Sequence, residues 1–79
     1  MNIELLVKMA NEISLFFASG SAPTQAARDV ATHMKRFWEP RMRRQIVTYY
    51  EKGQGEGLND LAREAVALLA AEARLSNSA

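Results

Sequence analysis

Hydrophobic residues recur at spacings of three and four over most of the chain, which is the periodicity of helices that bury one face. Four segments carry this pattern, at about residues 3–18, 23–39, 40–52 and 59–74, and none alternates with the period of two that indicates a strand. The sequence therefore predicts one all-α domain over residues 1–79, a small compact bundle of about four helices. Residues 76–79, Ser-Asn-Ser-Ala, are predicted to form a frayed tail.

The breaks between these segments contain residues that start and stop helices. Asn2 can cap the first helix, Gly20 can end it, and Pro23 suits the first turn of the second. Gly53 is the predicted C′ residue of the third helix. Residues 53–57 have glycine at every second position, which predicts a flexible hinge. They are not a phosphate-binding loop, because no strand precedes them and no Lys-Ser or Lys-Thr follows.

Residues 33–44 differ most from ordinary helical sequence. They contain the single His, the single Trp, one of the two prolines and half of the ten Lys and Arg residues. Pro40 lacks an N–H and disfavours the α region for Glu39, so one helix should end before Pro40 and another should begin there. The arginines that follow Pro40 lie in the first turn of the outgoing helix, where the positive end of the helix dipole repels them. An acidic partner would offset that cost.

Some of the apolar surface exceeds what one face of each helix can bury. Phe16 and Phe17 lie about 100° apart around the first helix, so one face cannot hold both. Residues 65–71 are apolar all the way round, a pattern that is normally covered on more than one side, and they are therefore a candidate surface for association with another molecule. We expect Phe37 and Trp38 to pack inside or against protein, because they are in phase with the core stripe of their helix.

Composition limits the chemistry of the chain. The absence of cysteine excludes disulfides, thiolate zinc sites and iron–sulfur ligation, and a formal net charge of +1 is too small to indicate nucleic-acid binding. The longest apolar run, residues 65–71, is far below the roughly 20 residues needed to cross a bilayer. The N-terminus lacks the positive region of a signal peptide. A soluble cytoplasmic protein without a membrane segment is expected.

Candidate catalytic and metal-binding residues are sparse. The single His33 lies on a helix rich in Lys and Arg, and every Ser except Ser14 lies in a predicted loop or at a terminus. The sequence thus offers no nucleophile paired with a base and an orienting acid. One His and scattered carboxylates show none of the ligand spacings of zinc or iron sites. We expect no catalytic residue, cofactor or metal on this chain.

The basic cluster in residues 35–44 permits three interpretations. It is a solvated rim, or it binds nucleic-acid phosphates with nearby aromatic rings for stacking, or it binds carboxylates of another protein. Trp together with Arg is typical of protein interface hot spots, which favours the third interpretation. The predicted partner-binding residues are Arg36, Phe37, Trp38, Pro40, Arg41, Arg43 and Arg44.

Two blocks, residues 8–13 followed by Phe16-Phe17 and then residues 33–43, resemble in their order the delta subunit of NAD-dependent, molybdenum-containing formate dehydrogenases. The Gly-rich turn before Leu58 and the Arg63-Glu64-Ala65 stretch of the last helix also fit that family. The most specific part of the resemblance is the run Arg-Phe-Trp-Glu-Pro-Arg-Met-Arg.

The resemblance implies a non-catalytic accessory subunit that binds and stabilises, or helps mature, a cytoplasmic formate dehydrogenase complex. Its partner would be the large catalytic alpha subunit, which carries molybdenum. The complex would contain molybdenum cofactor, iron–sulfur clusters and FMN, none of them on this chain. Two alternatives remain: a small nucleic-acid-binding module that uses the basic patch at residues 35–44, and a self-associating helical scaffold that is a homo-oligomer when isolated.

Overall fold

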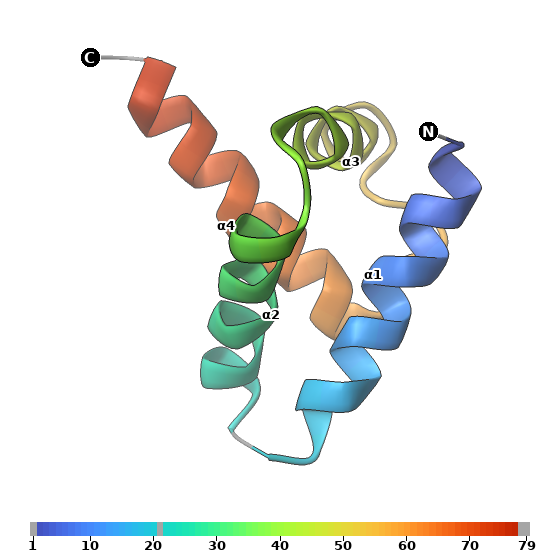
Figure 1. Cartoon of the computed structure of the whole chain (residues 1–79), viewed down its shortest axis with the longest axis vertical. Helices are drawn as coiled ribbons and strands as arrows, with labels where there is room; N and C mark the ends of the chain where they lie inside the picture. The colour runs from blue at the N-terminus through green and yellow to red at the C-terminus, as the bar shows by residue number, and fades with distance from the viewer. Residues whose placement is uncertain (1, 21, 78–79) are drawn as a thin grey trace.

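The computed structural model describes residues 2–20 and 22–77, and in these ranges the chain forms four helices and no strand. They are α1 (Ile3–Ala18), α2 (Pro23–Phe37), α3 (Pro40–Gly53) and α4 (Asp60–Asn77). α1 and α2 run in opposite directions, α3 lies across one end of the pair, and α4 passes diagonally behind (Figure 1). The predicted all-α fold of four helices with a corner at Pro40 is confirmed.

The core lies where α4 crosses the other three helices, all of which it contacts. Val30 and Met34 of α2, Ile46 of α3 and Val66 of α4 have no exposed surface. Burying a side chain of this size stabilises the fold by about 1.5–3 kcal/mol. Val30, Met34 and Ile46 thus lie on faces that the spacing of three and four predicts to be buried, whereas Val66 lies off the stripe predicted for α4.

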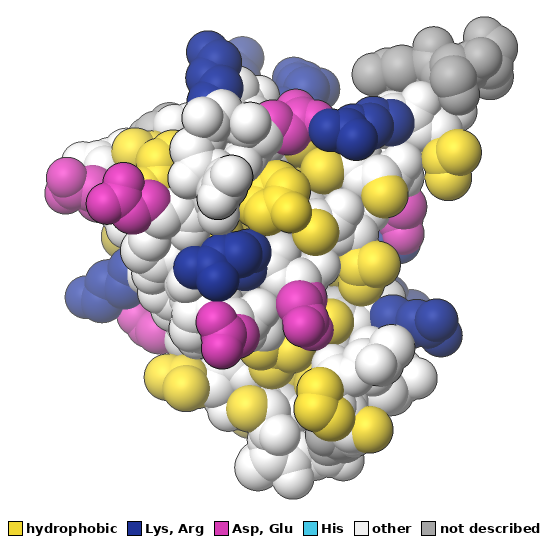
Figure 2. Space-filling view, turned by 180° about the vertical axis from the view of Figure 1, so that it is seen from behind, with side chains coloured by type: hydrophobic (Ala, Val, Ile, Leu, Met, Phe, Trp, Pro, Cys, Tyr) yellow, Lys and Arg dark blue, Asp and Glu magenta, His cyan; other side chains and the backbone are white. Residues whose placement is uncertain are grey.

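The apolar middle of α4 is covered within the chain itself. Ala65, Val66, Leu69 and Ala70 are all buried, because α1, α2 and α3 surround the helix on several sides. The opposite side of the molecule from Figure 1 shows apolar side chains interspersed with acidic and basic ones (Figure 2). The expectation that residues 65–71 form an intermolecular surface is therefore wrong for most of the segment.

Side-chain caps set two of the helix starts. The Asn2 carboxamide oxygen accepts a hydrogen bond from the Glu4 N–H at 2.7 Å, as predicted, and the Asn59 oxygen accepts one from the Ala62 N–H at 2.8 Å. α4 continues to Asn77, three residues beyond its predicted end. The predicted frayed tail falls in part on residues 78–79, which lie outside the described residues.

The glycine-rich turn between α3 and α4 is held by side chains. The Asn11 amide nitrogen donates to the Gly57 carbonyl at 2.9 Å, and the Asn11 oxygen accepts from the Asn59 N–H at 2.8 Å. The Asn59 side-chain amide also donates to the main-chain carbonyl of Asn11 at 3.4 Å. The prediction of a flexible hinge does not account for these bonds, which come from a helix that lies more than 45 residues away in sequence.

Gly55 explains why this turn contains glycine. Its φ is +73°, and a Cβ added there would lie 2.8 Å from Leu58 Cδ1 and 3.2 Å from Tyr50 Cδ1. Gly53, the predicted C′ residue, is the last residue of α3 instead. The left-handed position falls on Gln54, at φ 60°, whose N–H donates to the Tyr50 carbonyl at 2.7 Å. The predicted end of the helix was thus wrong by one residue.

Candidate partner-binding surface

The corner begins where Trp38 and Glu39 leave the helical conformation. Both are extended, with ψ angles of 140° and 150°, and Pro40 is the first residue of α3. The Trp38 N–H still donates to the Met34 carbonyl at 2.9 Å and so closes the last turn of α2. The Trp38 side chain is only 5% exposed and belongs to the core cluster. Trp38 therefore joins α2 to the core, as its phase in the sequence predicted.

Arg43 holds the other side of the corner. Its Nη1 donates to the Lys35 carbonyl at 2.6 Å and to the Trp38 carbonyl at 3.4 Å. The last carbonyls of a helix have no partner within the helix, and a cation there also interacts favourably with the helix dipole. Arg43 on α3 thus caps α2. The sequence placed Arg43 and Trp38 among the contact residues, and the structure gives both an internal role.

The remaining arginines of the corner face outward. Arg36, Arg41 and Arg44 are exposed, and within residues 2–20 and 22–77 none of the three forms an ion pair. Arg41 and Arg44 are three residues apart on α3 and so share one side of that helix. α3 also begins without a side-chain cap, so its positive end adds to the potential of the arginines. The exposed Pro40 lies between Arg36 and this pair in sequence.

Phe37 is adjacent to Trp38 in sequence but is 71% exposed. We expected Phe37 to pack inside or against protein; packing inside is wrong, because this last residue of α2 is largely exposed, while packing against another protein stays a prediction. The Phe37 ring lies 4.7 Å from the ring of His33, which in turn lies 5.8 Å from Phe17. Phe17 contacts Phe16 edge-on at 5.3 Å, and Phe16 is 80% exposed.

These four rings form a ledge that crosses from α1 to α2, and we call Phe16, Phe17, His33 and Phe37 the aromatic ledge. Sequence reasoning did not assign Phe16, Phe17 or His33 to the site. The signal that could have found them is the Phe16-Phe17 pair, since adjacent residues on a helix cannot both face one core. Large exposed apolar side chains that gather in one place commonly mark interaction surfaces.

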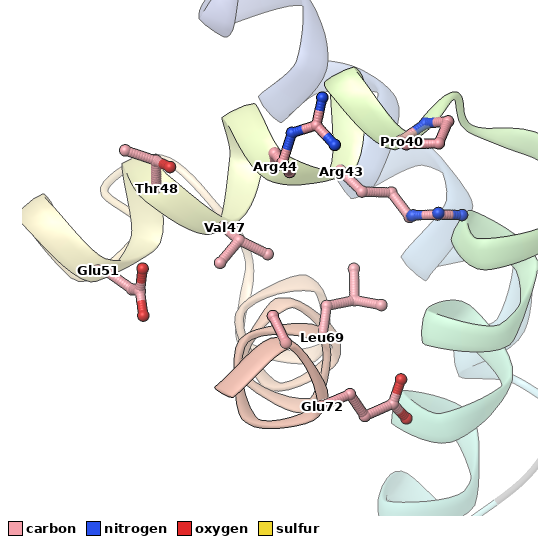
Figure 3. A pocket seen from close by; sticks show the side chains of 9 residues that line it. Pro40, Arg43, Arg44, Val47, Thr48, Glu51, Leu69 and Glu72 are labelled. Carbon is pink, nitrogen blue, oxygen red and sulfur yellow. The ribbon is translucent and has the colours of Figure 1, made fainter. Parts of the chain in front are cut away.

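A groove of about 450 Å³ lies between α3 and α4 beside the corner (Figure 3). Val47, Leu69 and Arg43 line it, and in the close-up the Arg43 side chain extends toward the end of α2. Its acidic side chains are already paired: Glu72 with Lys35 at 3.0 Å and Glu51 with Arg74 at 3.2 Å. Of the charged groups that line the groove, Arg44 alone has neither an ion pair nor a hydrogen bond within the described ranges.

The stacking platform required by the nucleic-acid interpretation is largely absent. Trp38 is buried, and Tyr49 and Tyr50 are half-buried. The Tyr49 hydroxyl donates to the Glu56 carbonyl at 2.7 Å, which ties that ring to the glycine-rich turn. Of the aromatic rings near the basic cluster, Phe37, Trp38, Tyr49 and Tyr50, only Phe37 is exposed, whereas stacking on single-stranded nucleic acid uses successive exposed rings.

Side chains that could bind a metal ion do not gather in the described part of the chain. Among the residues that the structure describes, no three His, Asp or Glu side chains converge as a ligand set, and the sequence contains no cysteine. In the same part of the chain, no helix is both long and apolar enough to cross a membrane.

Comparison with known proteins identifies a family. The model of the family described as NADH-dependent formate dehydrogenase delta subunit FdsD matches residues 5–66. This span includes most of α1, all of α2 and α3, the corner, the aromatic ledge and the first turns of α4. No curated protein and no solved structure matches the chain.

Proposed function

The chain belongs to the NADH-dependent formate dehydrogenase delta subunit family, and we propose that it is a non-catalytic accessory subunit that docks on the large molybdenum-containing subunit of that enzyme. Docking would stabilise the large subunit or assist its maturation in the cytoplasm. Molybdenum cofactor, iron–sulfur clusters and FMN would all lie on other subunits.

The observation that carries this proposal is the set of exposed, unpaired guanidinium groups at the corner. Arg36, Arg41 and Arg44 belong to the described part of the chain, and none of them meets a carboxylate there. Arg41 and Arg44 lie near the start of α3, where the helix dipole opposes a cation, so these two positions contribute little to the fold of the isolated chain. Arginine pairs with carboxylates in a two-pronged geometry that provides both affinity and orientation at protein interfaces.

The second support is the exposed Phe37 next to Arg36. An aromatic side chain that is 71% exposed leaves apolar surface in contact with water. Binding a partner would bury that surface, which favours association. Aromatic and arginine side chains together are enriched at the centre of protein interfaces.

Charge reversal tests the docking site. We expect Arg36→Glu plus Arg41→Glu to weaken binding to the purified large subunit at least about tenfold, since the double variant sets two carboxylates against an acidic surface. The matched control is Lys8→Glu plus Arg28→Glu, which makes the same charge change at exposed positions away from the corner. The control should bind within about twofold of wild type.

Biolayer interferometry against the immobilised large subunit measures the affinities, and circular dichroism confirms that both variants remain helical. Equal weakening of both double variants would show that net charge, and not the corner, governs binding. A parallel measurement with a random single-stranded oligonucleotide tests the nucleic-acid alternative. Affinity for the oligonucleotide that falls steeply with salt, without binding to the large subunit, would replace the proposal with that alternative.

A further inference from the structure

The groove of about 450 Å³ between α3 and α4 combines an apolar floor with charged walls, and we call it the α3–α4 groove. Val47 of α3 and Leu69 of α4 form the floor, and their side chains point toward each other in Figure 3. Val47 is 9% exposed and Leu69 is 5% exposed, so the floor has little contact with water. The exposed residues Pro40, Thr48 and Ala73 also line the groove.

The charged groups that line the groove are unequally satisfied. They are two cations and two carboxylates: Arg43, Arg44, Glu51 and Glu72. Each carboxylate already has its own cation within the chain, with Lys35 at 3.0 Å from Glu72 and Arg74 at 3.2 Å from Glu51. Arg43 donates to two main-chain carbonyls, which carry no net charge. The groove and its ion pairs thus hold four cations against two carboxylates.

The surrounding charges do not reverse this excess. Three exposed charged residues are next to lining residues in sequence, and two of them are cations: Glu39, Arg41 and Lys52. α3 begins at Pro40 without a side-chain cap, so its positive end adds to the potential. At the other wall, Arg74 lies in the last turn of α4 and offsets the negative end of that helix. Within the described ranges, Arg44 is thus an unpaired cation in a positive groove.

We propose that the α3–α4 groove binds a short acidic segment of the large subunit. A carboxylate of that segment pairs with Arg44, and a neighbouring apolar side chain lies on Val47 and Leu69. The identity of the partner rests on the function proposed above, whereas the chemistry of the bound segment rests on the charges and the floor of the groove.

An unpaired arginine beside an apolar floor favours a carboxylate as its ligand. The guanidinium binds a carboxylate through two parallel hydrogen bonds, and this interaction is stronger where water is excluded. A basic segment would set like charges against Arg43 and Arg44. The groove volume lies within the roughly 300–1,000 Å³ of ligand pockets, which gives room for a few side chains and not for a folded domain. The two ion pairs stay in place around the bound segment.

Two exposed alanines of α4 provide a matched test of this chemistry. Ala73 lines the groove, whereas Ala71 does not and lies about 200° away around the same helix. We expect Ala73→Glu to bind the purified large subunit at least about tenfold more weakly than Ala73→Lys, because only the former repels an acidic segment. Ala71→Glu and Ala71→Lys should differ by less than about threefold. Biolayer interferometry measures the four affinities.

Because the chain contains no cysteine, single-cysteine variants can carry a photocrosslinker at a chosen position. We expect Ala73→Cys, labelled with benzophenone, to crosslink to a segment of the large subunit that contains Asp or Glu next to an apolar residue. Labelled Ala71→Cys should give little of that product. Mass spectrometry identifies the segment, and a charge swap then tests the pair. Replacing its carboxylate residue by arginine should weaken binding, and Arg44→Glu should restore it.

The outcomes separate the two proposals. If wild type binds the large subunit but the variants at Ala73 behave like those at Ala71, the groove is not the binding site, although the proposed function stands. If Ala73→Lys binds as weakly as Ala73→Glu, or the crosslinked segment has no acidic residue, the acidic segment is overturned. A crosslink to a second copy of this chain overturns it as well. If wild type does not bind the large subunit, both proposals fail.

Circular dichroism checks that each variant remains helical. Should a variant at Ala73 lose helicity, Arg44→Glu compared with Arg28→Glu answers the same question, since Arg28 is exposed on α2 and does not line the groove. We expect Arg44→Glu to weaken binding at least about tenfold and Arg28→Glu to change it by less than about threefold. Equal effects of these two substitutions would overturn the proposal.

Discussion

The corner at Pro40 and the glycine-rich turn before α4 are both breaks between helices, yet they differ in how many of their side chains contact the rest of the chain. In the turn, the amides of Asn11 and Asn59 and the Tyr49 hydroxyl all make hydrogen bonds within the chain. At the corner, Trp38 and Arg43 hold the fold, while Phe37 and three arginines face solvent.

The difference separates a break that only closes the chain from one that leaves side chains exposed, as the proposed docking site requires. Glycine supplies only backbone freedom, and the turn has no large apolar group or unpaired cation left over once it is closed. The corner needs only one ring and one guanidinium to be closed, but it carries two rings and four arginines. Side chains that do not help to close the break stay hydrated in the free chain, so they carry no desolvation cost there. They remain available to a partner.

Within the corner, we expect the largest difference in contribution to stability between the two adjacent rings, Trp38 and Phe37. We expect Trp38→Ala to lower the free energy of unfolding by about 3–5 kcal/mol, because it removes a buried ring from the core, and Phe37→Ala to change it by less than about 0.5 kcal/mol. Urea titration followed by far-UV circular dichroism measures both, since Trp38→Ala removes the only Trp fluorescence. Equal destabilisation by the two substitutions would contradict the division of the corner into buried and exposed halves.

Two glycines sharpen the comparison in the turn. We expect Gly55→Ala to lower the free energy of unfolding by about 2–3 kcal/mol, because alanine is strained at positive φ and its Cβ would overlap Leu58. Gly53→Ala is the control, since nothing lies within 4 Å of a Cβ there and the residue is helical. That control should be neutral or stabilising by up to about 1 kcal/mol. Thermal denaturation distinguishes the opposite signs.

The next largest effect on stability is expected from loss of the hydrogen bonds that join Asn11 to the glycine-rich turn. We expect Asn11→Ala to lower the free energy of unfolding by about 1–2 kcal/mol, because it leaves the Gly57 carbonyl and the Asn59 N–H without their side-chain partner. Hydrogen exchange of the backbone amides of residues 54–59 should accelerate as well. Lys8→Ala, at an exposed position on α1, should leave both measurements unchanged. Exchange that stays slow in Asn11→Ala would show that the turn does not depend on this contact.

The smallest predicted effect compares two arginines of α3. We expect Arg43→Ala to lower the free energy of unfolding by about 1 kcal/mol, because the end of α2 loses its cap, and Arg44→Ala to change it by less than about 0.5 kcal/mol. Binding to the large subunit should respond in the opposite order, with the larger loss for Arg44→Ala. A loss of stability at Arg44 similar to that at Arg43 would remove the distinction between capping and docking arginines.

Much of the fold could be predicted from local pattern. The spacing of Val30, Met34 and Ile46 identified core faces, and Pro40 located the corner because its ring excludes a continuous helix. The cap at Asn2 followed from residue type. The contacts of Asn11 with the turn could not be predicted. They join residues that are separated by 46 and by 48 positions in the chain, and no local pattern carries that information.

The candidate site was predicted only in outline. The run at residues 36–44 indicated an interaction surface, but it grouped Arg43 and Trp38 with residues whose environments differ. The ledge was missed because its members come from α1 and α2, and only the packing of these helices brings Phe17 within 5.8 Å of His33. The apolar length of α4 was misjudged for a similar reason, because three neighbouring helices cover it.

The sequence by itself determined the helical class, the position of the corner and the absence of thiol chemistry. Periodicity and proline act on the local backbone, and the absence of cysteine can be read directly from the composition. Tertiary structure decided which of two adjacent rings is buried. Phe37 ends α2 and faces outward, whereas Trp38 follows in extended backbone that redirects its side chain into the core. That choice depends on where α3 and α4 lie around the end of α2, and the periodicity of one helix does not contain their positions.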